Sequence, residues 1–282
     1  MTEPSAAVSH QIPVGPFSTH YLTWGSPDRD PIVLLHDGAF GGSAAVSWSR
    51  IGPLLAQDFF VIAPDLLGFG DTAKAVFLGA SPYDFRLAHI ADLLLVIGIT
   101  EPVHLLGTSF GGSLALRALA SDAPLDVRSV TSVNGTGGPW RTPLALTELS
   151  RWDGTKEDLS RIVRLLMTDG PHLSKHLDRR YESASTPGHY RAVKAVAFPI
   201  PDALRTANPV GDPWPEQVTG RDTPVLLVAG SEDLLLETYW AQRLESVLSN
   251  CTVVTLPGRH APNVDDPDSL MSCVREFLDE HG

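Results

Sequence analysis

Three residue types that together perform nucleophilic catalysis occur in this chain at positions that favour their meeting. Ser109 lies in Gly107–Gly111, which reads Gly-Thr-Ser-Phe-Gly, after the apolar run Val103–Leu106 and before the helical composition of Ser113–Ala120. A serine on a sharp turn between a strand and a helix holds its Oγ clear of the sheet, and the flanking glycines let the chain fold back closely. A helix N-terminus directly after the serine favours negative charge. Ser109 is therefore the leading candidate nucleophile.

A serine hydroxyl is a weak nucleophile, so it needs a histidine to accept its proton and a carboxylate to orient that histidine. Asp233 follows the apolar run Pro224–Gly230, and His260 follows the last apolar run. Each alone has a simpler interpretation, because an aspartate in such a turn is usually a turn former, Glu232 is a rival acid, and nine other histidines compete with His260. The chain order of serine, acid and histidine, with the last two after late strands, favours a catalytic triad of Ser109, Asp233 and His260.

Attack by a serine creates an oxyanion that needs hydrogen-bond donors placed in advance. We expect these donors to be the backbone amides of Phe110, which follows the serine, and of Gly38, in the loop 36–42. The alternative interpretation of that loop is a glycine-rich surface turn. Asp37 is unusual there, because a carboxylate beside an anion hole is unfavourable unless its side chain points away.

The elements that must position these residues alternate between apolar, strand-like runs and helical segments. Strands are expected at Phe17–Trp24, Ile32–Leu35, Phe59–Ala63, Val103–Leu106, Val127–Val133, Pro224–Gly230 and Thr252–Leu256, and helices at Val46–Ala56, Ala88–Ile97, Ser113–Ala120, Leu159–Met167, Leu173–Tyr181, Leu235–Leu248 and Pro267–Glu280. Alternation at this spacing predicts an α/β fold with a mostly parallel central sheet flanked by helices.

The pattern changes between residues 140 and 205, where the segments look helical and no strand-like run occurs. We interpret residues 140–205 as a helical cap inserted into a core made of residues 1–139 and 206–282, with the proline-rich Pro199–Pro215 as the return connection. Large apolar side chains in or near the cap could line a pocket, although such residues more often serve packing. They are Trp140, Trp152, Met167, Phe198 and Trp214.

The composition limits the partners of the protein. The net charge of -12 argues against a nucleic-acid partner, no apolar run approaches the length of a membrane span, and Met1–His10 lacks the apolar region of a secretory signal. Cys251 and Cys273 are the only cysteines, so neither a disulfide framework nor a cysteine metal site is implied. We expect a cytoplasmic protein with a small-molecule substrate, no cofactor and no metal, and leave homo-oligomerisation open.

Four stretches carry a resemblance to a known family: Leu35–Ala44, Pro64–Gly70, Gly107–Gly112 and Val133–Gly138. Through them the whole chain resembles the α/β-hydrolases, and most of all the meta-cleavage product hydrolases, which cleave C–C bonds in aromatic degradation. The resemblance implies the α/β-hydrolase fold and its triad.

The resemblance also points to candidate substrate contacts. In that family an arginine followed by an aromatic residue on a cap helix contacts the acidic end of the substrate, and Arg180-Tyr181 matches that pair. Arg180, Asp37 and Trp140 are therefore the candidate substrate-binding residues, although an arginine on an exposed helix is usually just solvated.

The chain departs from the family at two places that border the substrate. The oxyanion loop of the family is usually close to His-Gly-Gly-Gly-Pro-Gly, but here it contains Asp37, Ala39 and Phe40, and Ala261 stands where a tryptophan usually follows the histidine. The fold and triad carry over, whereas the dienoate substrate does not.

The expected function is a cofactor-independent serine hydrolase acting on a small or medium hydrophobic carbonyl compound. The bond cleaved is a C–C bond next to a ketone or, as the alternative, a carboxylic ester or lactone. Dehalogenase and epoxide hydrolase chemistry is disfavoured, because those relatives use aspartate where Ser109 stands. A non-hydrolytic oxygenase, lyase or ligand-binding protein on the same fold is the less favoured alternative.

Overall fold

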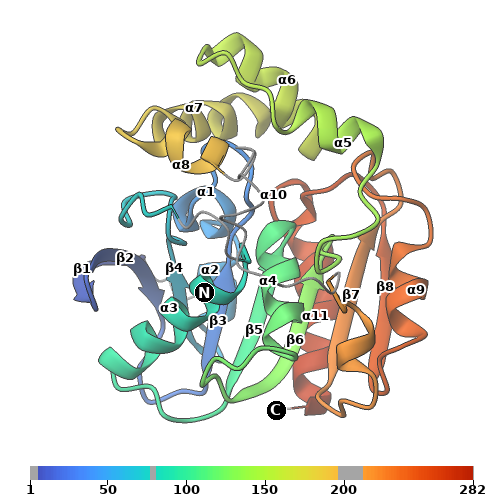
Figure 1. Cartoon of the computed structure of the whole chain (residues 1–282). Coiled ribbons are helices and arrows are strands. Elements are labelled where there is room, and N and C mark those ends of the chain that lie inside the picture. The colour runs from blue at the N-terminus through green and yellow to red at the C-terminus, as the bar shows by residue number, and fades with distance from the viewer. Residues whose placement is uncertain (1–5, 77–80, 196–211, 282) are drawn as a thin grey trace, which may run out of the picture.

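Eight strands form one sheet at the centre of the computed structural model, which describes residues 6–76, 81–195 and 212–281 (Figure 1). The strands are β1 (Val8–Val14), β2 (Phe17–Trp24), β3 (Pro31–Leu35), β4 (Phe60–Pro64), β5 (Val103–Thr108), β6 (Val127–Val133), β7 (Val225–Gly230) and β8 (Cys251–Leu256). Their order is β1-β2-β4-β3-β5-β6-β7-β8. β2 runs antiparallel to β1 and β4, and the other neighbours are parallel. The predicted α/β class with a mostly parallel sheet is therefore confirmed.

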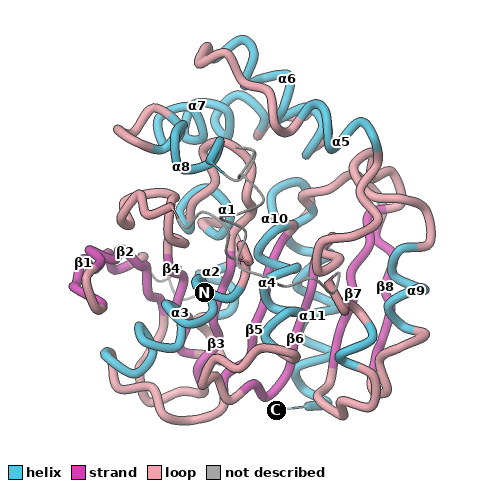
Figure 2. Tube along the Cα trace, viewed as in Figure 1, coloured by secondary structure: helices cyan, strands magenta, loops and turns pink. Residues whose placement is uncertain are grey.

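Helices cover both faces of this sheet, as Figure 2 shows. They are α1 (Ala44–Trp48), α2 (Gly52–Leu55), α3 (Asp84–Val96), α4 (Phe110–Ala118), α5 (Pro143–Glu148), α6 (Lys156–Leu166), α7 (Leu173–Ala184), α8 (His189–Ala195), α9 (Trp240–Glu245), α10 (Pro262–Asp265) and α11 (Pro267–His281), with a 3-10 turn at Glu216–Val218. One apolar cluster joins α3, α4 and α9 to one face of the sheet, and another joins α1, α2 and α11 to the opposite face. Central strands such as β3 are buried on both faces, which explains their continuous apolar sequences.

Three local expectations were wrong. β1 was not expected, because this edge strand is largely exposed, mixes polar residues with a proline, and pairs with β2 alone among the described strands. The expected helix Val46–Ala56 is broken into α1 and α2, since Pro53 has no N–H to donate within a helix. The expected helix Leu235–Leu248 is reduced to α9, because Leu235 and Glu237 form backbone hydrogen bonds with the chain at Thr142 and Trp140.

Helices α5 to α8 follow β6 and lie above the edge of the sheet where β5 and β6 end (Figure 1). They have an apolar cluster of their own, which includes Trp152 and Ile162 and also receives Phe40 from the loop after β3. This arrangement supports a helical cap at 140–205, and the division from a core of 1–139 and 206–282 stays our proposal. Phe198 and residues 199–211 of the expected return connection lie outside the described residues.

Within the part of the chain that the structure describes, no helix combines the length and apolar character needed to cross a membrane.

Candidate active site

Ser109 stands at the sharp turn between β5 and α4 with a φ of 55°, a left-handed conformation that a serine rarely adopts. Its amide donates a hydrogen bond to the carbonyl of Val133, at 2.8 Å, which fixes the turn to the end of the neighbouring strand. A Cβ at Gly107 would lie 2.1 Å from the carbonyl oxygen of Gly111, and one at Gly111 would lie 2.0 Å from that of Leu35. Only glycines therefore allow this close return of the chain, and the strain at Ser109 is held by the elements around it.

The structure brings Ser109, His260 and Asp233 into one hydrogen-bonded relay. The Oγ of Ser109 lies 2.8 Å from Nε2 of His260, and Nδ1 of His260 lies 2.7 Å from Oδ2 of Asp233. A carboxylate only accepts, so Nδ1 carries the proton and Nε2 is left to accept from the serine. The side chains of His260 and Asp233 are each 4% exposed, which shields the relay from water. This geometry suits proton transfer from the serine during attack on a carbonyl carbon.

Asn134, which was not predicted as a site residue, holds the two loops that carry the acid and the base. Its side-chain amide donates to the carbonyl of His260 at 3.0 Å and accepts from the amide of Gly230 at 2.9 Å. Its own φ is 50°, in the left-handed region that asparagine tolerates better than most residues. The position of Asn134 directly after a strand, in the stretch Val133–Gly138, was the sequence signal for this role.

Gly38 and Phe110, the predicted oxyanion donors, meet at the same cavity as Ser109. A Cβ at Gly38 would lie 2.8 Å from the Cβ of Phe110, so the loop after β3 approaches the turn as closely as a glycine permits. The carbonyl oxygen of a substrate attacked by Ser109 would therefore lie between these two stretches of backbone. Their role as oxyanion donors stays a prediction.

Asp37 points away from the cavity and forms a buried ion pair with Arg180 of α7. The two carboxylate oxygens accept from the guanidinium at 3.0 and 2.7 Å, and also from the amide of Ala39 and the hydroxyl of Ser47. Burial by itself would raise the pKa of Asp37, but the charge and hydrogen bonds of Arg180 hold it well below the ordinary range. The unusual carboxylate of the oxyanion loop is thus neutralised by the cap.

The geometry gives Arg180 a structural contact instead of the predicted substrate contact. Its remaining donors bond to the carbonyl of Phe40 and to His176, and the residue is 2% exposed. Burial beside this guanidinium lowers the pKa of His176 to about 3, so the neutral ring can accept the hydrogen bond. Neither Arg180 nor Asp37 is among the described residues that line the cavity. The arrangement therefore does not support a role for either in binding substrate.

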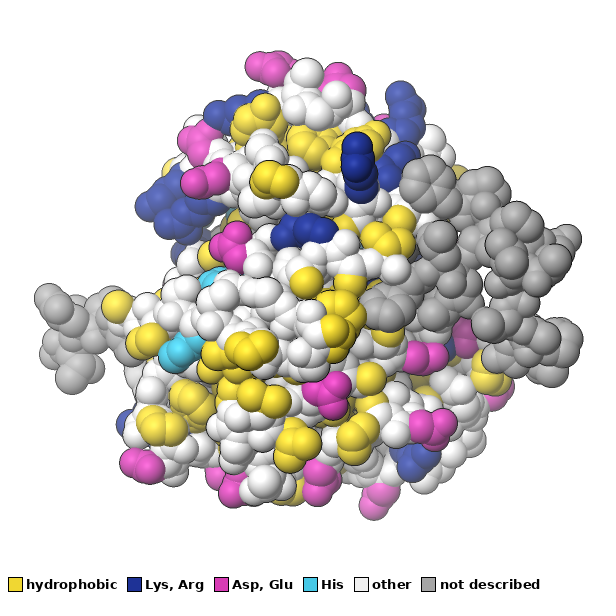
Figure 3. Space-filling model, turned by 60° about the vertical axis from the view of Figure 1, so that its left-hand side comes forward, with side chains coloured by type: hydrophobic (Ala, Val, Ile, Leu, Met, Phe, Trp, Pro, Cys, Tyr) yellow, Lys and Arg dark blue, Asp and Glu magenta, His cyan; other side chains and the backbone are white. Residues whose placement is uncertain are grey.

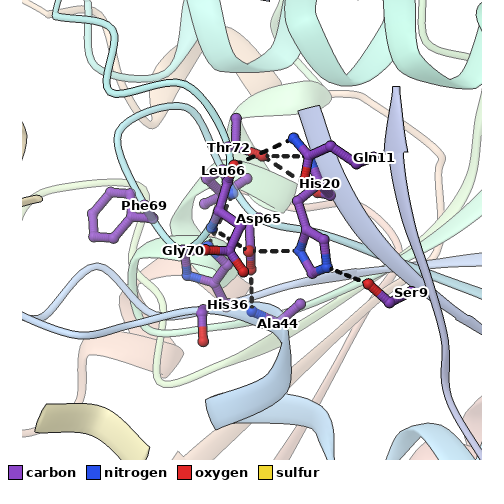
Figure 4. Close-up of polar contacts among 12 residues, drawn as sticks. Ser9, Gln11, His20, His36, Ala44, Asp65, Leu66, Phe69, Gly70 and Thr72 are labelled. Carbon is purple, nitrogen blue, oxygen red and sulfur yellow. Dashed lines mark hydrogen bonds and ion pairs between the residues drawn. The ribbon is translucent and has the colours of Figure 1, made fainter. Parts of the chain in front are cut away.

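The loop after β4 is held by a second buried network, centred on Asp65 (Figure 4). Oδ2 of Asp65 lies 2.8 Å from Nδ1 of His20 and 2.8 Å from the amide of Asp71, and Oδ1 accepts from the amide of Ala44 at 2.7 Å. Metal-ligating atoms of His20, Asp65 and Asp71 lie within 4.8 Å of one another. Both ring nitrogens of His20 are already hydrogen-bonded, Nδ1 to Asp65 and Nε2 to Ser9. The network therefore stabilises the loop after β4.

A cavity of about 400 Å³ extends from Ser109 and His260 to the inner side of the cap, where Leu149 and Val193 line it. Four of the five large apolar residues suggested for this lining pack elsewhere, and the fifth, Phe198, lies outside the described residues. Trp152 and Met167 belong to the apolar cluster of the cap, Trp214 donates to the carbonyl of Thr136, and Trp140 packs against the core. The lining instead includes Tyr83, Arg86 and Arg141, which were not predicted. Tyr83 and Arg86 precede the expected start of their helix, so no periodic signal marked them.

Comparison with known proteins gives three kinds of similarity. A model of the alpha/beta hydrolase family matches residues 32–271. The 2-hydroxy-6-oxo-6-(2'-aminophenyl)hexa-2,4-dienoic acid hydrolase of Metapseudomonas resinovorans is 24% identical over 278 residues, which cover 97% of this chain and 92% of that protein. Lipase 1 of Psychrobacter immobilis is 22% identical over 267 residues, which cover 91% of this chain and 79% of the lipase. The solved structure of the 2-hydroxy-6-oxo-6-phenylhexa-2,4-dienoate hydrolase from Rhodococcus sp. strain RHA1 is similar with a TM-score of 0.82 at 24% identity, covering 97% of this chain and 99% of that one.

Proposed function

The chain belongs to the alpha/beta hydrolase family, and we propose that it is a serine hydrolase of small or medium hydrophobic carbonyl compounds. The observation that carries this proposal is the relay from Ser109 through His260 to Asp233, which opens into a cavity of about 400 Å³. A cavity of this size suits a small organic molecule and is lined mainly by apolar side chains.

In the proposed mechanism, the Oγ of Ser109 attacks the carbonyl carbon while Nε2 of His260 accepts its proton. Asp233 keeps the imidazole in the required tautomer and stabilises the imidazolium that forms. The backbone amides of Gly38 and Phe110 donate to the developing oxyanion. His260 then returns the proton to the leaving group, and a water molecule activated by the same histidine releases the acyl group from the serine.

The first candidate reaction is cleavage of a C–C bond next to a ketone, as the names of similar proteins describe for ring-cleavage products. The second candidate is hydrolysis of a carboxylic ester or lactone. Two observations favour the second: the predicted cap contact Arg180 is held by Asp37, and Ala261 stands where an aromatic residue was expected beside the histidine. Similarity to a lipase agrees with this alternative.

The two candidates are separated by a rate panel with the wild-type protein and Ser109→Ala. The panel pairs p-nitrophenyl esters and lactones with a 2-hydroxy-6-oxo-dienoate, whose loss of visible absorbance reports cleavage. Fast dienoate cleavage would establish the C–C reaction, and ester or lactone turnover without it would establish the alternative. In either case Ser109→Ala should lose at least about 10³-fold in kcat. No turnover of any compound, together with no labelling of Ser109 by a fluorophosphonate, would refute the proposal.

We also propose a cytoplasmic location, because Cys251 and Cys273 are both free thiols and the chain holds no disulfide pair. Fractionation of the source cells against a periplasmic marker enzyme tests this location.

A further inference from the structure

The cavity contains a buried arginine that no carboxylate neutralises among the described residues. Arg86, in the first turn of α3, is 5% exposed and donates to the carbonyls of Leu67 and Pro82, at 3.1 and 2.7 Å. Its guanidinium carbon lies 4.5 Å from the ring centre of Phe85 and 5.2 Å from that of Phe110. Backbone carbonyls and ring faces leave a full positive charge at the cavity wall, and burial lowers the pKa of Arg86 to about 10, so the group stays protonated near neutral pH.

Two further polar groups line the same cavity near this guanidinium. The ring of Tyr83 stacks on that of Phe110 with centres 5.5 Å apart. Burial raises the pKa of the Tyr83 hydroxyl, and the charges of the nearby Arg117, Arg141 and Arg86 oppose that rise. Arg117, which also faces Tyr83, is already paired with Asp212. Arg141, like Arg86, has no acidic partner within ion-pair distance in the described part of the chain. Two cations without an acidic partner among the described residues and a phenol therefore line the cavity, and Arg86 and Tyr83 lie against Phe110, the residue that follows the nucleophile.

The charge distribution of the cap agrees with a negatively charged ligand. Residues 140–205 contain eleven Lys and Arg and eight Asp and Glu, although the whole chain has a net charge of -12. On the face drawn in Figure 3, most Lys and Arg side chains lie in the upper part, with several Asp and Glu among them, and acidic side chains are frequent along the lower edge. No Asp or Glu is among the described residues that line the cavity. An anion inside it would therefore meet only attractive or neutral side chains there.

We propose that Arg86 and Arg141, together with Tyr83, form a subsite for a carboxylate group of the substrate. This inference rests on the proposed hydrolase function and specifies its substrate class as carbonyl compounds that carry a carboxylate. Because the Arg86 guanidinium lies 5.2 Å from the ring of Phe110, beside Ser109, the carboxylate and the reacting carbonyl are joined by a short spacer. Arg86 and Tyr83 belong to the core and Arg141 stands at the start of the cap, whereas Arg180 of the cap is held in its ion pair with Asp37.

The kinetic test compares the mono-p-nitrophenyl ester of glutaric acid, which has a free carboxylate, with the neutral p-nitrophenyl pentanoate. We expect the wild-type protein to prefer the charged ester by about 10- to 100-fold in kcat/KM, the usual size of a charge-assisted hydrogen bond. Arg86→Gln and Arg141→Gln should each remove most of this preference, through a higher KM for the charged ester. Arg86→Lys should keep part of it, and the exposed Arg128→Gln serves as the matched control.

A binding measurement makes the test independent of turnover. In calorimetric titrations the wild-type protein should bind benzoate at least about tenfold more tightly than neutral benzamide, and Arg141→Gln should lose this difference. Arg141 is exposed, so its replacement keeps the test valid if Arg86→Gln fails to fold. Equal affinity for benzoate and benzamide would overturn the subsite. Ser109-dependent cleavage of the neutral ester with no preference for the charged one would overturn the subsite but leave the hydrolase function intact.

Discussion

The carboxylate of Asp37 accepts four hydrogen bonds, two of them from Arg180, and this pair joins the oxyanion loop to the cap. Removing one partner leaves a buried charge without compensation, which typically costs about 3–5 kcal/mol, whereas removing both costs much less. We expect Asp37→Asn and Arg180→Met each to lower the free energy of unfolding by about 3 kcal/mol or more. The double variant should lose much less stability than the sum of the two single losses.

Urea unfolding of the three variants measures these energies. Arg179→Met, which changes the exposed neighbour of Arg180 on α7, is the matched control and should stay within about 0.5 kcal/mol of the wild type. Additive single effects, or single effects below about 1 kcal/mol, would show that the pair does not stabilise the loop.

At the scale of elements, the turn between β5 and α4 depends on the contact between α4 and the end of β3. A Cβ at Gly111 would lie 2.0 Å from the carbonyl oxygen of Leu35, a backbone atom that cannot rotate aside. Gly111→Ala should therefore displace α4, lower the free energy of unfolding by about 1–3 kcal/mol and reduce kcat together with labelling of Ser109 by a fluorophosphonate. Gly170→Ala is the control, because a Cβ there meets nothing within 4 Å. Equal behaviour of the two variants would contradict the role given to Gly111.

At the scale of the whole molecule, buried histidines make the fold sensitive to acid. Burial lowers the pKa of five of them: His36, His89, His104, His176 and His189. Below about pH 6.5 these residues take up protons in the unfolded chain but not in the folded one, so stability falls as the pH drops from 6.5 towards 4. Each contributes at most about 1.4 kcal/mol per pH unit in that range.

Urea unfolding at pH 7.5, 6.0 and 5.0 should show a steep loss of stability and an uptake of several protons on unfolding. His20 acts in the opposite direction, because its hydrogen bond to Asp65 raises its pKa, and the stability it adds below pH 6.5 is lost as the pH rises. His89→Gln should reduce the proton uptake by about one. A flat stability profile between pH 7.5 and 5.0 would contradict this account.

Local sequence determined every strand except β1, most helices and the candidate triad. A continuous apolar run indicates a buried strand, as at β5. The glycines on either side of Ser109 indicate a turn so tight that a side chain at those positions would clash with the backbone. Because parallel strands end at one edge of the sheet, the order of Ser109, Asp233 and His260 was enough to predict that they meet. β1 was missed because this exposed edge strand mixes polar residues with a proline and has no continuous apolar run.

Tertiary structure decided what faces the cavity. The ion pair between Asp37 and Arg180 joins residues 143 positions apart, and nothing in either local stretch marks the other as its partner. Arg86 and Arg141 reach the same cavity from a core helix and from the connection into the cap, and Asn134 joins loops that follow two later strands. Periodicity and turn chemistry act between near neighbours in the chain, whereas the pairing of buried charges depends on how distant elements pack.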